Sequence, residues 1–230
     1  MIVTEHFAYL HLHKSAGSFV NEALLRFIPG ARQIGYHLPR SALPPDCAHL
    51  PVIGFVRNPW SYYVSWYNFQ RRLPQQNALY RLLSDEGRLD FVATLANMQS
   101  LGSGGALLQP LLDALPAQYS NRGLNVPSGA MSRIAHSGRG FYSFLYHHIY
   151  DGASTRYISR MEQLRTELPR MLVAVGQPVG TALRSYIEDA PARNAAAHAS
   201  YAEWYTPETR ALVAERDAEV INEFGYRFGD

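Results

Sequence analysis

The chain has a single cysteine, Cys47, among its 230 residues. This excludes an intrachain disulfide and a zinc site built from cysteines. No stretch approaches the roughly 18 consecutive apolar residues that indicate a membrane-spanning helix. The first residues lack the basic start and the uninterrupted apolar run of a signal peptide. We therefore expect a soluble, cytoplasmic protein without a membrane span.

Charged residues are also scarce. They make up 17% of the chain, whereas hydrophobic residues make up 47%, a composition typical of a folded core rather than of disorder. The net charge of +2 is far below the basic excess of a nucleic-acid-binding protein, so we expect no nucleic-acid partner. The sequence indicates no oligomeric state.

Lysine is nearly absent. Of the 21 basic residues, 20 are arginines and one, Lys14, is a lysine. Since either residue serves on most surfaces, a position that keeps lysine could need a compact ammonium rather than a planar guanidinium. Chance explains the observation equally well, because one residue has to be the last lysine.

Lys14 follows a short apolar run that predicts a strand. Residues 7–12 read FAYLHL, the loop at 13–18 reads HKSAGS, and apolar residues at helical spacing follow as far as Phe27. A small, flexible loop with an ammonium and hydroxyls at a helix N-terminus can hold an anion. The Walker spacing, in which glycines precede the lysine, is missing. An ordinary turn in which Ser18 caps the helix remains the alternative.

A second strand, loop and helix begin at the apolar run 52–56. This run is typical of a buried parallel strand, and Asn58 followed by Pro59 predicts the start of a helix. Arg57 stands between the two elements and needs an anion, while Ser65 is a hydroxyl in a helix that is apolar on nearly all sides. Because ligands bind at the carboxyl ends of parallel strands, both loops are candidates for one site.

The remaining pattern predicts further helices at 89–98, 141–150 and 162–175, a short strand at 33–37 and a late strand at 156–159. Thr206 and Pro207 predict the start of a last helix that ends near Gly225. We interpret residues 1–230 as a single domain in which approximately residues 72–150 form an insertion of helices and loops.

Both loops and the tail resemble the sulfotransferases that use 3′-phosphoadenosine 5′-phosphosulfate (PAPS), especially the carbohydrate and bacterial branch. HKSAGS is similar to the family's 5′-phosphosulfate loop, and Arg57 with Ser65 eight residues later is similar to its 3′-phosphate motif. The sequences RMEQL at 160–164, YAEWYTPE at 201–208 and FGY at 224–226 also resemble members of the family. Residues 72–150 match nothing in it.

The resemblance implies a P-loop NTPase-like three-layer α/β fold with a central parallel sheet, and PAPS bound across the strand ends. The enzyme would move a sulfuryl group from PAPS to a hydroxyl of a small-molecule or glycan acceptor by in-line displacement. It would release adenosine 3′,5′-bisphosphate (PAP). The unmatched segment 72–150 would recognise the acceptor.

The resemblance also implies roles for individual residues. Lys14 would contact the oxygen that bridges sulfur and phosphorus, while Arg57 and Ser65 would hold the 3′-phosphate. Phe19 would lie against adenine, although a place in the core explains it equally well. A basic residue near the C-terminus completes the family's site, and here Arg193 or His198 could serve. The implied nucleotide-binding residues are Lys14, Ser15, Ala16, Gly17, Ser18, Phe19, Arg57, Ser65 and Arg193.

The acceptor proton needs a base, for which the family uses glutamate or histidine. His37 lies 23 residues after Lys14 at the end of the predicted strand 33–37, and no carboxylate lies near it in the sequence. Imidazole suits this task because its unperturbed pKa is about 6.5. We therefore predict that Lys14 and His37 are catalytic. A structural or surface histidine is the alternative, and His136 and His147 are the next candidates for the base.

Two other interpretations of the chain stay open. A nucleotide-dependent kinase or NTPase of the same fold would need Mg²⁺ and a Walker lysine. A non-catalytic PAP-binding module would bind without turnover. His11 and His13 lie on one side of the first predicted strand, but a zinc site there would lack a third ligand, so we expect no metal.

Overall fold

The computed structural model describes residues 1–121, 123–191 and 200–230. They form two compact units, each of which combines separate stretches of the chain. The first unit contains Met1–Arg57 and residues 149–191, and the second contains the described residues of Asn58–His148 and 200–230. Within the described ranges, no helix is both long enough and apolar enough to cross a membrane.

A five-stranded sheet forms the centre of the first unit, with the order β3-β1-β2-β4-β5. β2, β4 and β5 run parallel, and β1 and β3 add antiparallel pairs at one edge. The predicted parallel sheet is thus present as the core of a mixed sheet. Its strands are β1 (Ile2–Val3), β2 (Ala8–Leu10), β3 (Arg32–Gln33), β4 (Val52–Val56) and β5 (Arg156–Arg160).

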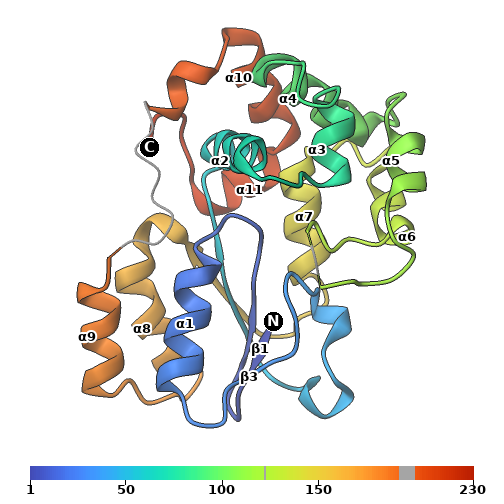
Figure 1. Ribbon diagram of the computed structural model, residues 1–230. Coiled ribbons are helices and arrows are strands. Elements are labelled where there is room, and N and C mark those ends of the chain that lie inside the picture. The colour runs from blue at the N-terminus through green and yellow to red at the C-terminus, as the bar shows by residue number, and fades with distance from the viewer. Residues whose placement is uncertain (122, 192–199) are drawn as a thin grey trace. The chain divides into compact units, whose positions relative to one another are not determined.

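Three helices cover one face of this sheet: α1 (Gly17–Phe27), α8 (Leu164–Ala174) and α9 (Thr181–Asp189) (Figure 1). Side chains alternate between the two faces of a strand, so Ile53 and Phe55 of β4 both enter the core with Leu24 and Leu172. Each such side chain contributes about 1.5–3 kcal/mol through burial. The predicted helix at 162–175 begins as a 3₁₀ turn, η5 (Met161–Gln163), before α8 continues it through an internal proline.

The hydroxyl of Tyr150 joins the carboxyl ends of β2 and β4. Its Oη lies 3.2 Å from the carbonyl oxygen of Leu10 and 3.1 Å from that of Phe55. The ring occupies the space beside Gly54, where a Cβ would lie 2.4 Å from the hydroxyl oxygen. The strand therefore needs glycine at position 54 because an aromatic side chain lies directly against its backbone.

The second unit is helical throughout its described elements. The helix predicted to start at Pro59 and the helix predicted at 141–150 are confirmed as α2 and α7. Asn58 caps α2 by accepting hydrogen bonds from the backbone of Trp60 and Ser61. Its helices are α2 (Pro59–Arg72), α3 (Ala78–Leu83), α4 (Phe91–Ser100), α5 (Leu108–Ala114), α6 (Ser128–Met131), α10 (Pro207–Arg216), α11 (Ala218–Phe224) and α7 (Phe141–Tyr150), whose last two residues belong to the first unit.

Asp217 divides the predicted last helix into α10 and α11. Its carboxylate is fully buried and accepts hydrogen bonds of 2.8 Å from the Tyr63 hydroxyl and from the backbone nitrogen of Ser143. Burial raises the pKa of Asp217, although these hydrogen bonds oppose the shift. The predicted start at Thr206 and Pro207 and the predicted end near Gly225 are confirmed. The division at Asp217 was not predicted, because the apolar spacing does not show that this carboxylate turns inward.

The packing at Gly54 can be tested by Gly54→Ala. The new methyl group must displace the buried Tyr150 ring, and overpacking of this kind costs about 1–3 kcal/mol. We expect a lower free energy of unfolding in urea. Gly129→Ala is the matched control, because a Cβ there has no neighbour within 4 Å. Equal stability of the two variants would contradict the described packing.

Candidate active site

Lys14 and Arg57 lie side by side where β2 and β4 end. The parallel register pairs Leu10 with Gly54, so the chain leaves both strands at the same edge of the sheet. Nη1 of Arg57 donates a hydrogen bond to the carbonyl oxygen of Lys14 at 3.3 Å. Burial and then the Arg57 charge lower the pKa of Lys14 from 10.5 to about 8. A bound anion would offset this repulsion between the two cations.

The backbone of the loop also suits an anion. Lys14 and Ala16 adopt left-handed conformations, with φ of 59° and 58°, and alternating conformations of this kind direct successive N–H groups toward one point. Ala16 is the N-cap of α1, and its side chain makes no cap hydrogen bond, while its carbonyl accepts from the N–H groups of Phe19 and Val20. The N-terminus of a helix of this kind favours an anion. Ser18 lies inside the first turn, so the alternative in which Ser18 caps the helix was wrong.

His37 lies against two histidines of this loop. Its ring stacks on that of His13, with centroids 3.7 Å apart and 14° between the planes, and its centroid is 4.3 Å from that of His11. Nδ1 of His37 lies 2.9 Å from the carbonyl oxygen of His11. Because a carbonyl only accepts, Nδ1 must carry the proton and Nε2 must keep its lone pair. The neutral ring therefore has the tautomer that a base requires at Nε2.

The expectation that His37 ends a strand needs correction. β3 stops at Gln33, and His37 follows in a loop with φ 51°. The pKa of His37 also departs from the unperturbed value of about 6.5. Burial lowers the pKa to about 4, although the bond to the His11 carbonyl opposes the shift. His37 is consequently neutral at physiological pH.

The position of the His11 ring explains why residue 17 is a glycine. A Cβ at this position would lie 1.5 Å from Nε2 of His11, so any side chain would displace the imidazole. His11 is itself 7% exposed, and burial lowers its pKa well below 6.5. The sequence did not identify His11 and His13 as neighbours of His37. The signal that could have indicated this was their spacing, because residues two apart in a strand lie on the same face of the sheet.

The other predicted residues of the loop have different environments. Ser15 is buried, and its hydroxyl donates to the carbonyl oxygen of His13 at 3.3 Å, whereas Ser18 is exposed. Phe19 is 6% exposed and packs against Tyr186, with ring centroids 5.4 Å apart. These contacts are those of a core residue.

Three further predicted residues lie elsewhere. Ser65 is partly buried on α2 and belongs to the second unit. Arg193 and its alternative His198 lie outside the described residues. The first unit thus brings Lys14, Ser15, Gly17, Arg57 and His37 into one region.

The histidine cluster does not have the arrangement of a metal site. Among the described residues, no three His, Cys, Asp or Glu side chains converge in a way that could hold a metal ion. The rings of His13 and His37 stack face to face, whereas ligands to zinc direct their nitrogens at a common point.

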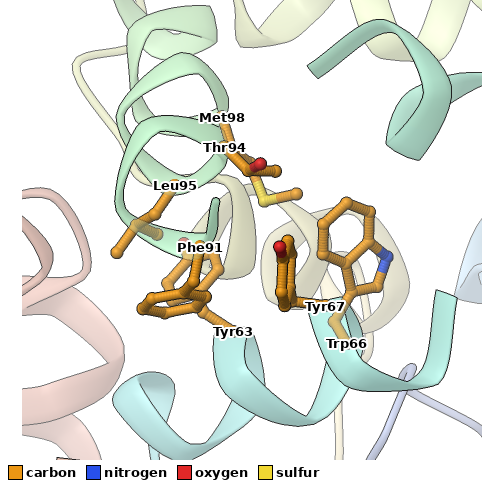
Figure 2. A pocket seen from close by; sticks show the side chains of 7 residues that line it. All are labelled: Tyr63, Trp66, Tyr67, Phe91, Thr94, Leu95 and Met98. Carbon is orange, nitrogen blue, oxygen red and sulfur yellow. The ribbon is translucent and has the colours of Figure 1, made fainter. Parts of the chain in front are cut away.

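The second unit contains a small cavity among aromatic rings. Figure 2 shows its lining by side chains of α2 and α4, and its volume is about 10 Å³. Ligand pockets usually measure about 300–1,000 Å³, so this cavity cannot hold an acceptor. The Tyr63 hydroxyl donates to the Asp217 carboxylate, and the Tyr67 hydroxyl donates to the Leu89 carbonyl. The lining residues are Tyr63, Trp66, Tyr67, Phe91, Thr94, Leu95 and Met98.

Comparison with known proteins supports the fold. No protein-family model and no curated protein matches the chain. Among solved structures, the chain is similar to mouse sulfotransferase SULT7A1 complexed with PAP, with a TM-score of 0.51 and 15% sequence identity. The match covers 95% of this chain and 86% of that chain. At this identity the likeness concerns the fold, and it confirms the predicted P-loop-like α/β fold with a parallel core.

The electrostatics of the loop can be tested through Lys14, the chain's single lysine. Selective ¹⁵N labelling gives one side-chain amine signal, which we expect to titrate near pH 8. Arg57→Gln should raise this pKa toward 10.5, because it removes the neighbouring charge. Arg184→Gln, which changes an exposed arginine on α9, should leave it unchanged. A wild-type pKa of 10 or above would contradict the described burial.

Proposed function

We propose that this protein is a PAPS-dependent sulfotransferase that transfers a sulfuryl group to an acceptor hydroxyl and releases PAP. The observation that carries the proposal is the pairing of Lys14 and Arg57 beside a left-handed loop at the N-terminus of α1. The similarity in fold to a PAP-bound sulfotransferase supports it. The loop sequence HKSAGS, similar to the family's phosphosulfate loop, supports it independently.

The residues of the loop fit an anionic donor. The two cations Lys14 and Arg57, together with the N–H groups at the start of α1, can balance the negative charge of the phosphosulfate. Ser15, Ala16, Gly17 and Ser18 would contribute backbone donors around the 5′-phosphate. When bound, PAPS would supply the activated sulfuryl group.

Lys14 and His37 would perform opposite tasks in the reaction. As the bond between sulfur and the bridging oxygen breaks, the Lys14 ammonium would stabilise the charge that develops on that oxygen. As the acceptor oxygen bonds to sulfur, Nε2 of His37 would take the acceptor's proton. Both tasks need the protonation states that these residues have at neutral pH, namely charged lysine and neutral histidine.

The 3′-phosphate would be held by Arg57 and, from the motif alone, by Ser65. Arg193 retains its role as a sequence-based prediction, and so does Phe19 beside adenine. We propose that the whole chain acts as one sulfotransferase domain and that residues 72–150 select a small-molecule or glycan acceptor. Stacking contacts with aromatic side chains are one means by which that segment could recognise an acceptor ring.

Donor selectivity tests the proposal directly. We expect PAP to raise the melting temperature more than AMP or ATP at equal concentration and without Mg²⁺, because only PAP carries a 3′-phosphate. At about 100 times its Kd, PAP would contribute roughly 2.7 kcal/mol of stability. Arg57→Gln should remove the preference for PAP over AMP, and Arg184→Gln should keep it.

The alternative functions give different results in the same experiment. Stabilisation by ATP that depends on Mg²⁺, with none by PAP, would favour a kinase or NTPase. Binding of PAP without turnover of PAPS in a screen of sugar and alkyl alcohols would favour a binding module. Equal stabilisation by PAP and AMP would refute the 3′-phosphate assignment.

The pH dependence tests the two catalytic assignments. The profile of kcat/KM reports the free enzyme, so its acid limb should lie near pH 4, where His37 gains a proton. Its alkaline limb should lie near pH 8, where Lys14 loses one. His37→Ala should lower kcat by about 10²–10⁴-fold and abolish the acid limb while PAP affinity is kept. An acid limb that persists in His37→Ala would transfer the role to another base.

A further inference from the structure

Three imidazoles from two separate segments form one cluster at the edge of the sheet. His11 and His13 precede Lys14 in the loop after β2, whereas His37 arrives from the segment after β3. The cluster is compact, with His37 in ring contact with both of the others. His11 and His13 are each 7% exposed. The proposed transfer reaction uses only His37, so the other two need an explanation.

The two loop histidines restrain His37 in complementary ways. The carbonyl of His11 bonds to Nδ1 of His37 at 2.9 Å and so selects the tautomer. The ring of His13 lies parallel to that of His37, within 14°, and so limits rotation about the bond from Cβ to the ring. Loss of the parallel contact would let the His37 ring turn away from the carbonyl. The direction of Nε2 depends on both contacts.

The restraint also reaches the start of α1. The His11 ring fills the space above Gly17, where a Cβ would lie 1.5 Å from its Nε2. His11, His13, Lys14 and Gly17 are parts of one short loop, so movement of the donor-binding backbone must move the two groups that hold His37. The position of the base is therefore coupled to the position of the lysine.

We propose that His11 and His13 are positioning residues that hold His37 in a single tautomer and orientation beside Lys14. This inference rests on the proposed function, because only a catalytic base needs an Nε2 that is unprotonated and held in one direction. The structural part concerns the unliganded protein and is tested there. Misplacement of a reacting group by about 1 Å can reduce a rate about 10²-fold.

Imidazole ¹⁵N NMR of the whole protein tests the arrangement. At pH 7, the His37 signals of the wild type should show a protonated Nδ1 and an unprotonated Nε2. His13→Leu should convert them to the averaged signals of a ring that exchanges between tautomers. His13→Phe keeps a flat ring for stacking and should recover the single tautomer. His49→Ala, which removes an exposed histidine of the same unit, is the control.

Kinetics then connect the arrangement to the reaction. His13→Leu should lower kcat about 10²-fold with little change in PAP affinity, and His13→Phe should recover most of that loss. If His37 of the wild type exchanges between the two tautomers, the inference is overturned. This outcome does not depend on whether His13→Leu folds. A single tautomer retained in His13→Leu would overturn it as well.

The result also separates this inference from the proposed function. If His37→Ala turns over normally while His13→Leu loses the tautomer, the positioning contacts are correct and the assignment of His37 as base is wrong. If His37→Ala is inactive but His13→Leu keeps both tautomer and rate, the base stands and the positioning role fails.

Discussion

Parallel pairing between β2 and β4 is the constraint on which the candidate site depends. It places the two strand ends at one edge of the sheet, so that residues 43 positions apart, Lys14 and Arg57, come within hydrogen-bond distance. Tyr150 reinforces the same edge, since its hydroxyl lies within 3.2 Å of carbonyl oxygens from both strands. A shift in this register would move Arg57 away from Lys14 and break the hydrogen bond from Arg57 to the Lys14 carbonyl.

Burial acts on the two proposed catalytic groups in the same direction but with different consequences. It disfavours the charged form of both Lys14 and His37 and lowers the pKa of each. For His37 the shift is favourable, because a neutral ring is a base. For Lys14 the shift reduces the range of pH over which the ammonium persists. A bound phosphosulfate would counteract that loss, so donor binding and the charge of Lys14 support one another.

Local signals in the sequence located most of the secondary structure near the site. The all-apolar run 52–56 is fully buried as β4, and Asn58 with Pro59 starts α2 as predicted. These signals succeed because strand burial and helix capping depend on adjacent residues. The errors arose where distant contacts decide the conformation. Asp217 lies at the junction of α10 and α11, and its carboxylate bonds to Tyr63 and Ser143, which are far away in the sequence.

By itself, the sequence determined the α/β class, the two strand–loop–helix patterns and the single lysine in the first loop. These follow from apolar spacing, capping residues and composition, all of which are local. Only the tertiary structure decided which groups surround His37 and which of its two ring nitrogens carries the proton. The stacking of His13, the carbonyl of His11 and the space above Gly17 join residues through packing. Spacing along a chain does not specify packing, because it depends on how separate segments fold back against one another.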